Sequence, residues 1–217
     1  MPASPARTGR LSAPERRTQI LRAAMRCFAS NGYRGTTTRE IAASCGITEA
    51  ALYRYFTSKR ALYDALIDEK SAVPPIPQLV SEAVAQRDDH AVFGTVARVL
   101  IERALGDPDF IRLLFFTALE EHQLSDRFYR SRVGGLSGFL IEYLEARIAE
   151  GAFVERDAAL AARAFLGGVS DYINVRVIFA HGEIYPQTTD SVVESFVGLF
   201  LAGMRHADPD PPGRSRT

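Results

Sequence analysis

One segment of this chain, residues 37–56, carries the signals for two short helices joined by a glycine turn. Thr37 and Glu40 have the spacing of a capping box, in which the Thr oxygen accepts a hydrogen bond from a first-turn N–H and the Glu reaches back to the cap residue. The helix that they begin should end at Gly46, because glycine takes positive φ without steric cost and lets the chain reverse. Thr48 then caps a second helix. Two helices across a short turn that contains glycine predict a helix-turn-helix.

The two faces of the second helix differ in character. The side chains that should point inward lie at i, i+1, i+4 and i+5 and are Ala51, Leu52, Tyr55 and Phe56. The opposite face consists of Glu49, Ala50, Tyr53 and Arg54. A short surface helix gains little from this mixture, whereas a helix that enters the major groove of DNA needs it. The small residue permits close approach, and the donors reach phosphates and base edges.

The segment around this motif resembles a known family. Residues 12–66 contain the pattern G-Y-x-G-T-T, I-A, C-G-I-T, A-L-Y-x-Y-F and S-K-x-x-L. It is similar to the DNA-binding domain of the tetracycline-repressor-like (TetR) family of bacterial regulators. Two positions depart from the commonest family pattern: Cys45 stands where Ala is usual, and Ala50 where Gly is frequent. Both are small, so we expect the same fold, although Ala50 bears on how closely the helix approaches DNA. The alternative is that the same spacing builds a helical subdomain that does not bind DNA.

We predict DNA contacts by residues at the helix starts and on the exposed face of the second helix. They are Thr37, Thr48, Glu49, Ala50, Tyr53, Arg54 and Lys59. For Tyr53 and Lys59, the resemblance implies contacts with DNA phosphates. Lys59 lies in the first turn of a helix capped by Ser58, where a cation is unfavourable for the helix dipole, so its charge should have another use. Glu49 either caps the dipole of its own helix or accepts a hydrogen bond from cytosine N4.

Charge is unevenly distributed along a chain whose net charge is zero. Residues 1–60 contain 11 Lys and Arg and 3 Asp and Glu, whereas residues 61–217 contain 15 and 23. A basic N-terminal head (residues 1–60) followed by an acidic remainder is typical of a domain that binds a polyanion, joined to a domain that does not. A solvated surface alone gives the same asymmetry. We expect double-stranded DNA with a palindromic site as the partner of the head.

The chain should be all-α and divide into four segments. We expect a disordered arm at 1–11, a three-helix helix-turn-helix domain at 12–57, a helical ligand-binding and dimerisation domain at 58–206, and a disordered tail at 207–217. The first helix should begin at Ser12 and end at Asn31–Gly32. Around the proline-rich break at 73–77, further helices are expected at 58–70, 77–87, 89–105, 107–122, 125–150, 157–180 and 189–205, the last capped by Thr189.

The C-terminal segment is rich in aromatic residues, which form either an ordinary core or the lining of a mainly apolar cavity for a small molecule. The candidates for ligand contact are Phe93, Phe110, Leu114, Phe115, Phe128, Tyr143 and Tyr172. Asp171 either anchors a ligand or makes a solvated or interface hydrogen bond. The helices at 157–180 and 189–205 are apolar over more than one stripe, which predicts a four-helix dimer interface.

The sequence does not support other kinds of site. It has no phosphate-binding glycine loop, nucleophile elbow or isolated pair of carboxylates, so we expect neither enzyme activity nor a cofactor. The four histidines are far apart and the two cysteines fall on apolar helical stripes without metal spacing, so no metal is predicted. Without a secretory signal or a long apolar run, we expect a cytoplasmic protein with no membrane contact.

Together these features predict a ligand-responsive transcriptional regulator that acts as a homodimer. The resemblance implies that an effector in the C-terminal domain shifts the helix at 58–70. This shift would change the separation of the two recognition helices, which must match one turn of DNA, about 34–36 Å. We expect a repressor that a small, mainly apolar effector releases from its operator. The alternatives are a structural DNA-binding protein without a ligand, and an enzyme with an appended helix-turn-helix, against which the lack of a catalytic cluster argues.

Overall fold

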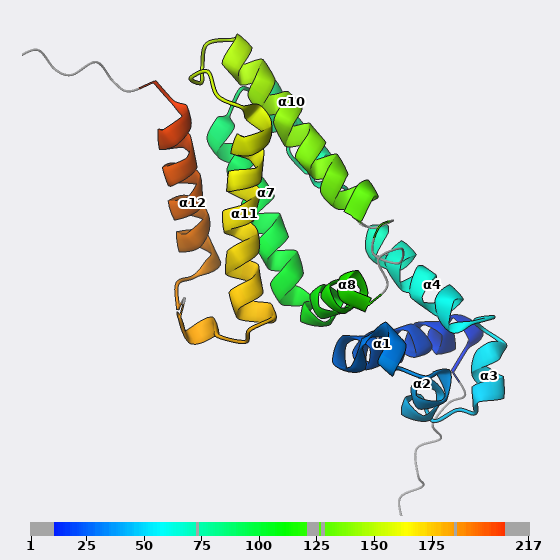
Figure 1. Cartoon of the computed structure of the whole chain (residues 1–217). Coiled ribbons are helices and arrows are strands. Elements are labelled where there is room, and N and C mark those ends of the chain that lie inside the picture. The colour runs from blue at the N-terminus through cyan, green and yellow to red at the C-terminus, as the bar shows by residue number, and fades with distance from the viewer. Residues whose placement is uncertain (1–10, 73, 121–125, 127–128, 185, 207–217) are drawn as a thin grey trace, which may run out of the picture. The chain divides into compact units, whose positions relative to one another are not determined.

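The computed structural model describes residues 11–72, 74–120, 126, 129–184 and 186–206, and in that part every regular element is a helix (Figure 1). The predicted all-α fold class is confirmed. The chain packs as two compact units, residues 1–73 with 109–126 and residues 74–108 with 127–217. Because each unit combines segments that are distant in the sequence, the domain limits expected at residues 12, 58 and 207 stay a prediction. The expected arm and tail lie outside the described residues, except for Leu11 at the end of the arm.

The first packing unit contains α1 (Ala13–Gly35), α2 (Thr38–Ser44), α3 (Glu49–Tyr53), α4 (Lys59–Ser71) and nearly all of α8 (Pro108–Glu120). Local signals in the sequence explain where these helices begin. Ser12 and Glu15 form the capping box at the start of α1, and Thr37 and Glu40 form the one at the start of α2. The side chain of Ser58 caps α4.

A break interrupts α1 near its end at Gly32, where φ is +73°. The helix was expected to end here, and one more helical turn follows the break. The Glu120 carboxylate at the end of α8 accepts a hydrogen bond from the backbone N–H of Arg34 at 2.9 Å. A Cβ at position 32 would lie 2.1 Å from Oε1 of Glu120. The positive φ favours glycine here, and a larger residue would also have to displace the Glu120 carboxylate.

The core of the first unit is formed by the facing apolar sides of its helices. Its fully buried side chains include Ile20, Phe28, Ile41, Leu52, Leu62 and Tyr63. The rings of Phe28, Tyr33 and Tyr63 pack together with centroids 5.6 to 6.3 Å apart. Burial raises the pKa of Tyr63, whose hydroxyl is hydrogen-bonded to Thr117. This contact ties α4 to α8.

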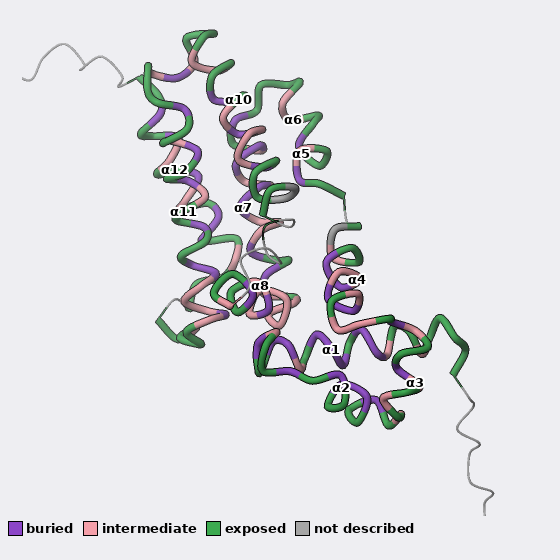
Figure 2. Tube along the Cα trace, turned by 45° about the vertical axis from the view of Figure 1, so that its right-hand side comes forward, coloured by how far each residue is buried: buried purple, intermediate pink, exposed green. Residues whose placement is uncertain are grey.

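The second packing unit contains α5 (Ile76–Leu79), α6 (Ser81–Ala85), α7 (Asp89–Gly106), the π-helix η1 (Tyr129–Gly134), α10 (Gly135–Ala149), α11 (Ala158–Val177), the 3-10 helix η2 (Gly182–Ile184) and α12 (Thr189–Met204). Within this unit, α7 packs against α11 and α12, and α10 packs against α11. Figure 2 shows buried stripes running along each of these long helices, as expected for amphipathic elements.

The second unit differs from the sequence prediction at several helix boundaries. Val80, with φ −108° and ψ 5°, divides the helix expected at 77–87 into α5 and α6. Part of the helix expected at 125–150 is the π-helix η1. Thr188, and not Thr189, caps α12, because its side chain accepts the hydrogen bond from the backbone N–H of Ser191. The cap is therefore one residue earlier than predicted.

Aromatic packing joins α7, α10, α11 and α12. Phe93 is fully buried, and its ring centroid lies 6.0 Å from Tyr143, 5.0 Å from Phe165 and 4.8 Å from Phe200. Such tilted and edge-on aromatic pairs add about 0.5–1.5 kcal/mol each beyond the area that they bury. Phe93 is therefore central to the core of this unit.

A buried ion pair joins the first turn of α7 to α10. Arg147 donates from Nε to Oδ1 of Asp89 at 2.8 Å and from Nη2 to Oδ2 at 3.0 Å. The hydroxyl of Tyr143 donates to the same Oδ1 at 2.6 Å. Burial raises the pKa of Tyr143, and its hydrogen bond with Asp89 raises it further, so the hydroxyl stays a donor. The hydrogen bond with Asp89 likewise raises the pKa of Arg147.

Candidate nucleic-acid interface

The turn after α2 sets the position of α3, the second helix of the predicted motif. Gly46 takes φ +66°, and the backbone N–H of Ile47 returns to the carbonyl of Ala42 at 3.0 Å. Oγ1 of Thr48 then accepts a hydrogen bond from the backbone N–H of Ala51 at 3.1 Å and begins α3. The predicted helix, glycine turn and second helix are confirmed.

The two faces of α3 agree with the predicted pattern. Leu52 is fully buried and Phe56 is 4% exposed, whereas Ala50, Tyr53 and Arg54 are exposed. The helix itself ends at Tyr53, with Arg54 as its C-cap, and is therefore shorter than expected. The predicted DNA-binding residues of this segment lie together on α3 and at its ends. Their contacts with DNA stay a prediction.

Threonines at the start of α2 lie beside α3. Thr37 is exposed, and its Oγ1 accepts a hydrogen bond from the backbone N–H of Glu40 at 3.2 Å. Thr38 is buried; its Oγ1 donates to Oε1 of Glu49 at 2.5 Å and lies 3.1 Å from the hydroxyl of Tyr53. The sequence did not single out Thr38, because its partners are 11 and 15 residues away and the contacts depend on the angle between α2 and α3.

The ammonium group of Lys59 lies against the end of α1. Its Nζ donates to the carbonyls of Tyr33 at 2.8 Å and Thr36 at 3.0 Å, and lies 4.4 Å from the centroid of the Tyr33 ring. A cation is favourable there, because the C-terminus of a helix carries partial negative charge. The charge thus has a use inside the protein. An ammonium has three hydrogens and these carbonyls take two, so the predicted phosphate contact is compatible with them.

The first unit exposes several arginines. They are Arg17, Arg22, Arg26, Arg34, Arg39, Arg54 and Arg60. Some also have partners within the protein: Arg17 lies 4.9 Å from the centroid of the Phe56 ring, and Arg60 pairs with Asp64 at 3.1 Å. Exposed arginines favour binding to a polyanion such as DNA, because they neutralise its phosphates and release the counterions condensed on the polyanion.

The predicted ligand residues fall in different surroundings, and their role stays a prediction. On the second unit, the core contains Phe93 and Tyr143, and α11 carries Tyr172. On the first unit, α8 carries Phe110, Leu114 and Phe115. Phe115 is 42% exposed. Phe128 lies outside the described residues.

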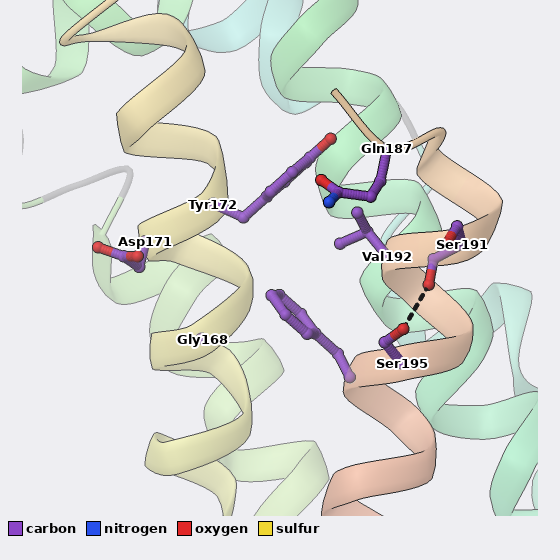
Figure 3. Close-up of a pocket in the computed structure, with 8 residues that line it drawn as sticks. Gly168, Asp171, Tyr172, Gln187, Ser191, Val192 and Ser195 are labelled. Carbon is purple, nitrogen blue, oxygen red and sulfur yellow. Dashed lines mark hydrogen bonds between the residues drawn. The ribbon is translucent and has the colours of Figure 1, made fainter. Parts of the chain in front are cut away.

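A cavity of about 390 Å³ lies between α11 and α12 (Figure 3). It is lined by Gly168, Asp171, Tyr172, Gln187, Ser191, Val192, Ser195 and Phe196. The side chain of Tyr172 points from α11 toward Gln187, whereas Asp171 points to the other side of the helix. Of the seven candidates for ligand contact, leaving aside Phe128 outside the described residues, only Tyr172 lines this cavity; Asp171, for which a ligand anchor was one alternative, is also among the lining residues. The cavity is open to the surface, and the exposed residues of both helices border it.

Cys27 and Cys45 are free thiols, and burial raises the pKa of Cys45. No three His, Cys, Asp or Glu side chains of the described ranges are grouped as metal ligands would be. None of the described helices combines the length and the hydropathy that a membrane crossing needs.

Two family matches cover most of the chain. Residues 20–66 match the family described as bacterial regulatory proteins, tetR family, and residues 93–204 match the family described as AefR-like transcriptional repressor, C-terminal domain. The second match alone covers more than half of the sequence. A related protein is the nucleoid occlusion factor SlmA of Escherichia coli O1:K1, which is 32% identical over 136 residues. The match covers 61% of this chain and 64% of SlmA, so the chain spans less than two thirds of that relative.

Solved structures share the fold at low sequence identity. NalD, the secondary repressor of the MexAB-OprM multidrug efflux pump in Pseudomonas aeruginosa, matches with a TM-score of 0.67 and 18% identity, covering 89% of this chain and 98% of its own. AibR in complex with isovaleryl coenzyme A and operator DNA matches with a TM-score of 0.60 and 24% identity, covering 85% of this chain and 97% of its own. The helix-turn-helix formed by α2 and α3 and the two family matches lead to one conclusion: the chain belongs to the TetR family of bacterial transcriptional regulators.

Proposed function

We propose that this regulator is a homodimeric repressor, that its two α3 helices bind the half-sites of a palindromic operator, and that a small, mainly apolar effector lowers its affinity for DNA. The observation that carries the proposal is the exposed face of α3. It presents Ala50, Tyr53 and Arg54 to solvent, on a unit with many exposed arginines. The small side chain permits close approach to base edges, and the other two supply hydrogen-bond donors.

Relatives support the effector and the sign of regulation. The family matched by residues 93–204 is described as a transcriptional repressor, and NalD is a repressor. The AibR structure contains both isovaleryl coenzyme A and operator DNA. The second unit of this chain is rich in aromatic side chains, which suit a mainly apolar molecule.

The helix through which an effector would act is α4. Its first residue, Lys59, donates hydrogen bonds to two carbonyls at the end of α1. Its Tyr63 is hydrogen-bonded to Thr117 of α8. A shift of α4 would therefore move α1 and, with it, the helices that pack on α1. A coupling of only ~1–3 kcal/mol between two sites changes affinity by about 5–150-fold, which is enough for a switch.

Exposed glycines within the last two helices support the dimer. They are Gly167 and Gly168 in α11 and Gly198 and Gly203 in α12, and a Cβ at any of them would meet nothing within 4 Å in the same chain. None of them has a positive φ. Glycine in a helix costs about 1 kcal/mol relative to alanine, so a benefit must come from outside the chain. We infer that helices of a second protomer approach there, where Leu160 and Leu199 are also 65% and 75% exposed.

A second candidate is a family member that binds DNA without an effector. The match to SlmA, a nucleoid occlusion factor, favours this candidate. It predicts weak discrimination among DNA sequences and no molecule that releases the DNA. The repressor predicts a palindromic site and effector-dependent binding.

Selection of duplexes from a random pool by the full chain tests the proposal. We expect enrichment of a palindrome whose half-site centres lie one helical turn apart, about 34–36 Å, or a multiple of it. Small apolar molecules that release the protein from this duplex would then identify the effector class. Binding without a shared sequence would favour the second candidate, and a protein that binds no duplex would contradict both.

Lys59→Ala should weaken binding to every duplex by a similar factor and reduce the salt slope by about one unit, if Lys59 contacts a phosphate. It should also lower the free energy of unfolding by about 2 kcal/mol, because two carbonyls at the end of α1 lose a charged donor. Titrations with an operator duplex at several salt concentrations measure the first effect, and urea titration measures the second.

Arg60→Ala is the matched control for Lys59→Ala. It removes the same charge one residue away, where the guanidinium pairs with Asp64, and leaves the end of α1 intact. A salt slope that is the same in wild type and in a folded Lys59→Ala protein would show that Lys59 serves only the end of α1.

A further inference from the structure

A buried hydroxyl of α2 holds two polar groups of α3. Oγ1 of Thr38 lies 2.5 Å from Oε1 of Glu49 and 3.1 Å from the hydroxyl of Tyr53. Thr38 is 9% exposed, whereas Tyr53 is 45% exposed and Glu49 is half-buried. Buried Thr38 therefore links two side chains, Glu49 and Tyr53, that are more exposed than it is.

With Glu49 as a carboxylate, the hydroxyl hydrogens of Thr38 and Tyr53 can be arranged in only one way. A carboxylate only accepts, so the hydroxyl hydrogen of Thr38 goes to Glu49. Thr38 has no second hydrogen, so the hydroxyl of Tyr53 donates to Thr38. The hydrogen bonds thus run in one direction, from Tyr53 through Thr38 to Glu49.

A phosphate that approaches Tyr53 competes for the same hydrogen. A phosphate oxygen only accepts hydrogen bonds, so Tyr53 can donate to it only if its hydrogen bond to Thr38 breaks. The contact between Tyr53 and Thr38 is neutral and 3.1 Å long, whereas the one between Thr38 and Glu49 is charge-assisted and 2.5 Å long. Charge-assisted bonds are about twice as strong, so the neutral contact breaks and Glu49 keeps its donor.

We propose that Thr38 is a positioning residue for base recognition: it fixes the carboxylate of Glu49 as an acceptor for cytosine N4, and it competes with phosphate for the hydroxyl hydrogen of Tyr53. Thr38 donates its hydroxyl hydrogen to Oε1 of Glu49. Oε2 of the same carboxylate is left to accept a hydrogen bond from a base edge. A side chain that is fixed beforehand loses less rotamer freedom on binding. This inference rests on the proposed function, because both contacts require DNA.

The test uses full-length Thr38→Val, which keeps the shape of the side chain without the hydroxyl, and Thr38→Ser, which keeps the hydroxyl. Affinities are measured for the duplex that wild type enriches, for its single-base variants, and for an unrelated duplex of equal length. Glu49→Ala first identifies the base pair that Glu49 reads. At that base pair, Thr38→Val should reduce discrimination by about tenfold, and Thr38→Ser should retain it.

Binding to the unrelated duplex separates positioning from damage to the fold. Thr38→Val should bind it as tightly as wild type or more tightly, because Thr38 no longer competes for the Tyr53 hydrogen. A damaged domain would lose affinity for both duplexes. In the Glu49→Ala background, Thr38→Val should have no further effect on discrimination.

Three results would overturn the inference. They are wild-type base preferences in Thr38→Val, unchanged base preferences in Glu49→Ala, and equal weakening of both duplexes by Thr38→Val. A wild-type protein that enriches no sequence would contradict the proposed function instead.

Discussion

Asp89→Ala should lower the free energy of unfolding by about 3 kcal/mol. Asp89 is 8% exposed and accepts hydrogen bonds from Arg147 and Tyr143. Without this carboxylate, a guanidinium that is only 13% exposed loses two of its hydrogen bonds and a buried hydroxyl loses its acceptor. The loss should be at the lower end of the range for a broken buried pair, because Glu150 still accepts a hydrogen bond from Arg147 at 2.5 Å.

Urea titration at a fixed protein concentration measures this loss, and Asp88→Ala is its matched control. Asp88 is the neighbouring residue and caps α7 by accepting a hydrogen bond from the backbone N–H of Ala91 at 2.9 Å. Loss of an N-cap costs about 1 kcal/mol. Equal losses in the two variants would mean that Asp89 acts only at the start of α7, and would refute a role for the buried pair.

Gly168→Arg should convert the proposed dimer to monomers, weakening self-association by about 100-fold or more. In a single chain nothing lies within 4 Å of a Cβ at this position, so the larger side chain should be tolerated by the fold. Across a helix–helix interface the same side chain would hold the helices apart and bury an unpaired charge. Sedimentation equilibrium over a range of concentrations measures the change.

Phe196→Asp gives a second, independent probe of the same interface. Its ring lies 6.3 Å from that of Tyr172 and lines the cavity between α11 and α12. Gly106→Arg is the control for Gly168→Arg, because Gly106, at the end of α7, is also an exposed helical glycine with nothing within 4 Å of its Cβ position. If Gly168→Arg and Gly106→Arg associate as tightly as wild type, the interface lies on another surface.

The helix starts and the faces of α3 could be predicted because the signals are local. A capping box joins residues three apart, as Thr37 and Glu40 show, and it acts whatever the rest of the chain does. The buried and exposed faces of α3 follow from helical period alone. The sequence also indicated that the charge of Lys59 has a separate use, because its position in the first turn of α4 is unfavourable.

Contacts between distant segments could not be predicted in the same way. Asp89 and Arg147 are 58 residues apart, and no pattern in either helix selects the other as its partner. The aromatic residues show the same limit, because helical period tells which rings point inward but not whether they fill a core or line a cavity. Phe93, Tyr143 and Tyr172 are all buried, yet only Tyr172 of the three also lines the cavity between α11 and α12, although all three carry the same signal in the sequence.

The break at Gly32 has a consequence for chimeric regulators, in which the DNA-reading part of one protein is joined to the sensing part of another. Helices α1 to α4 share their packing unit with α8, and the carboxylate of Glu120 occupies the space that a Cβ at position 32 would need. A graft that is cut after α4 would leave the backbone N–H of Arg34 without this acceptor. Exchange of the reading part should therefore include α8, or the recipient should supply a carboxylate at the end of its own equivalent helix.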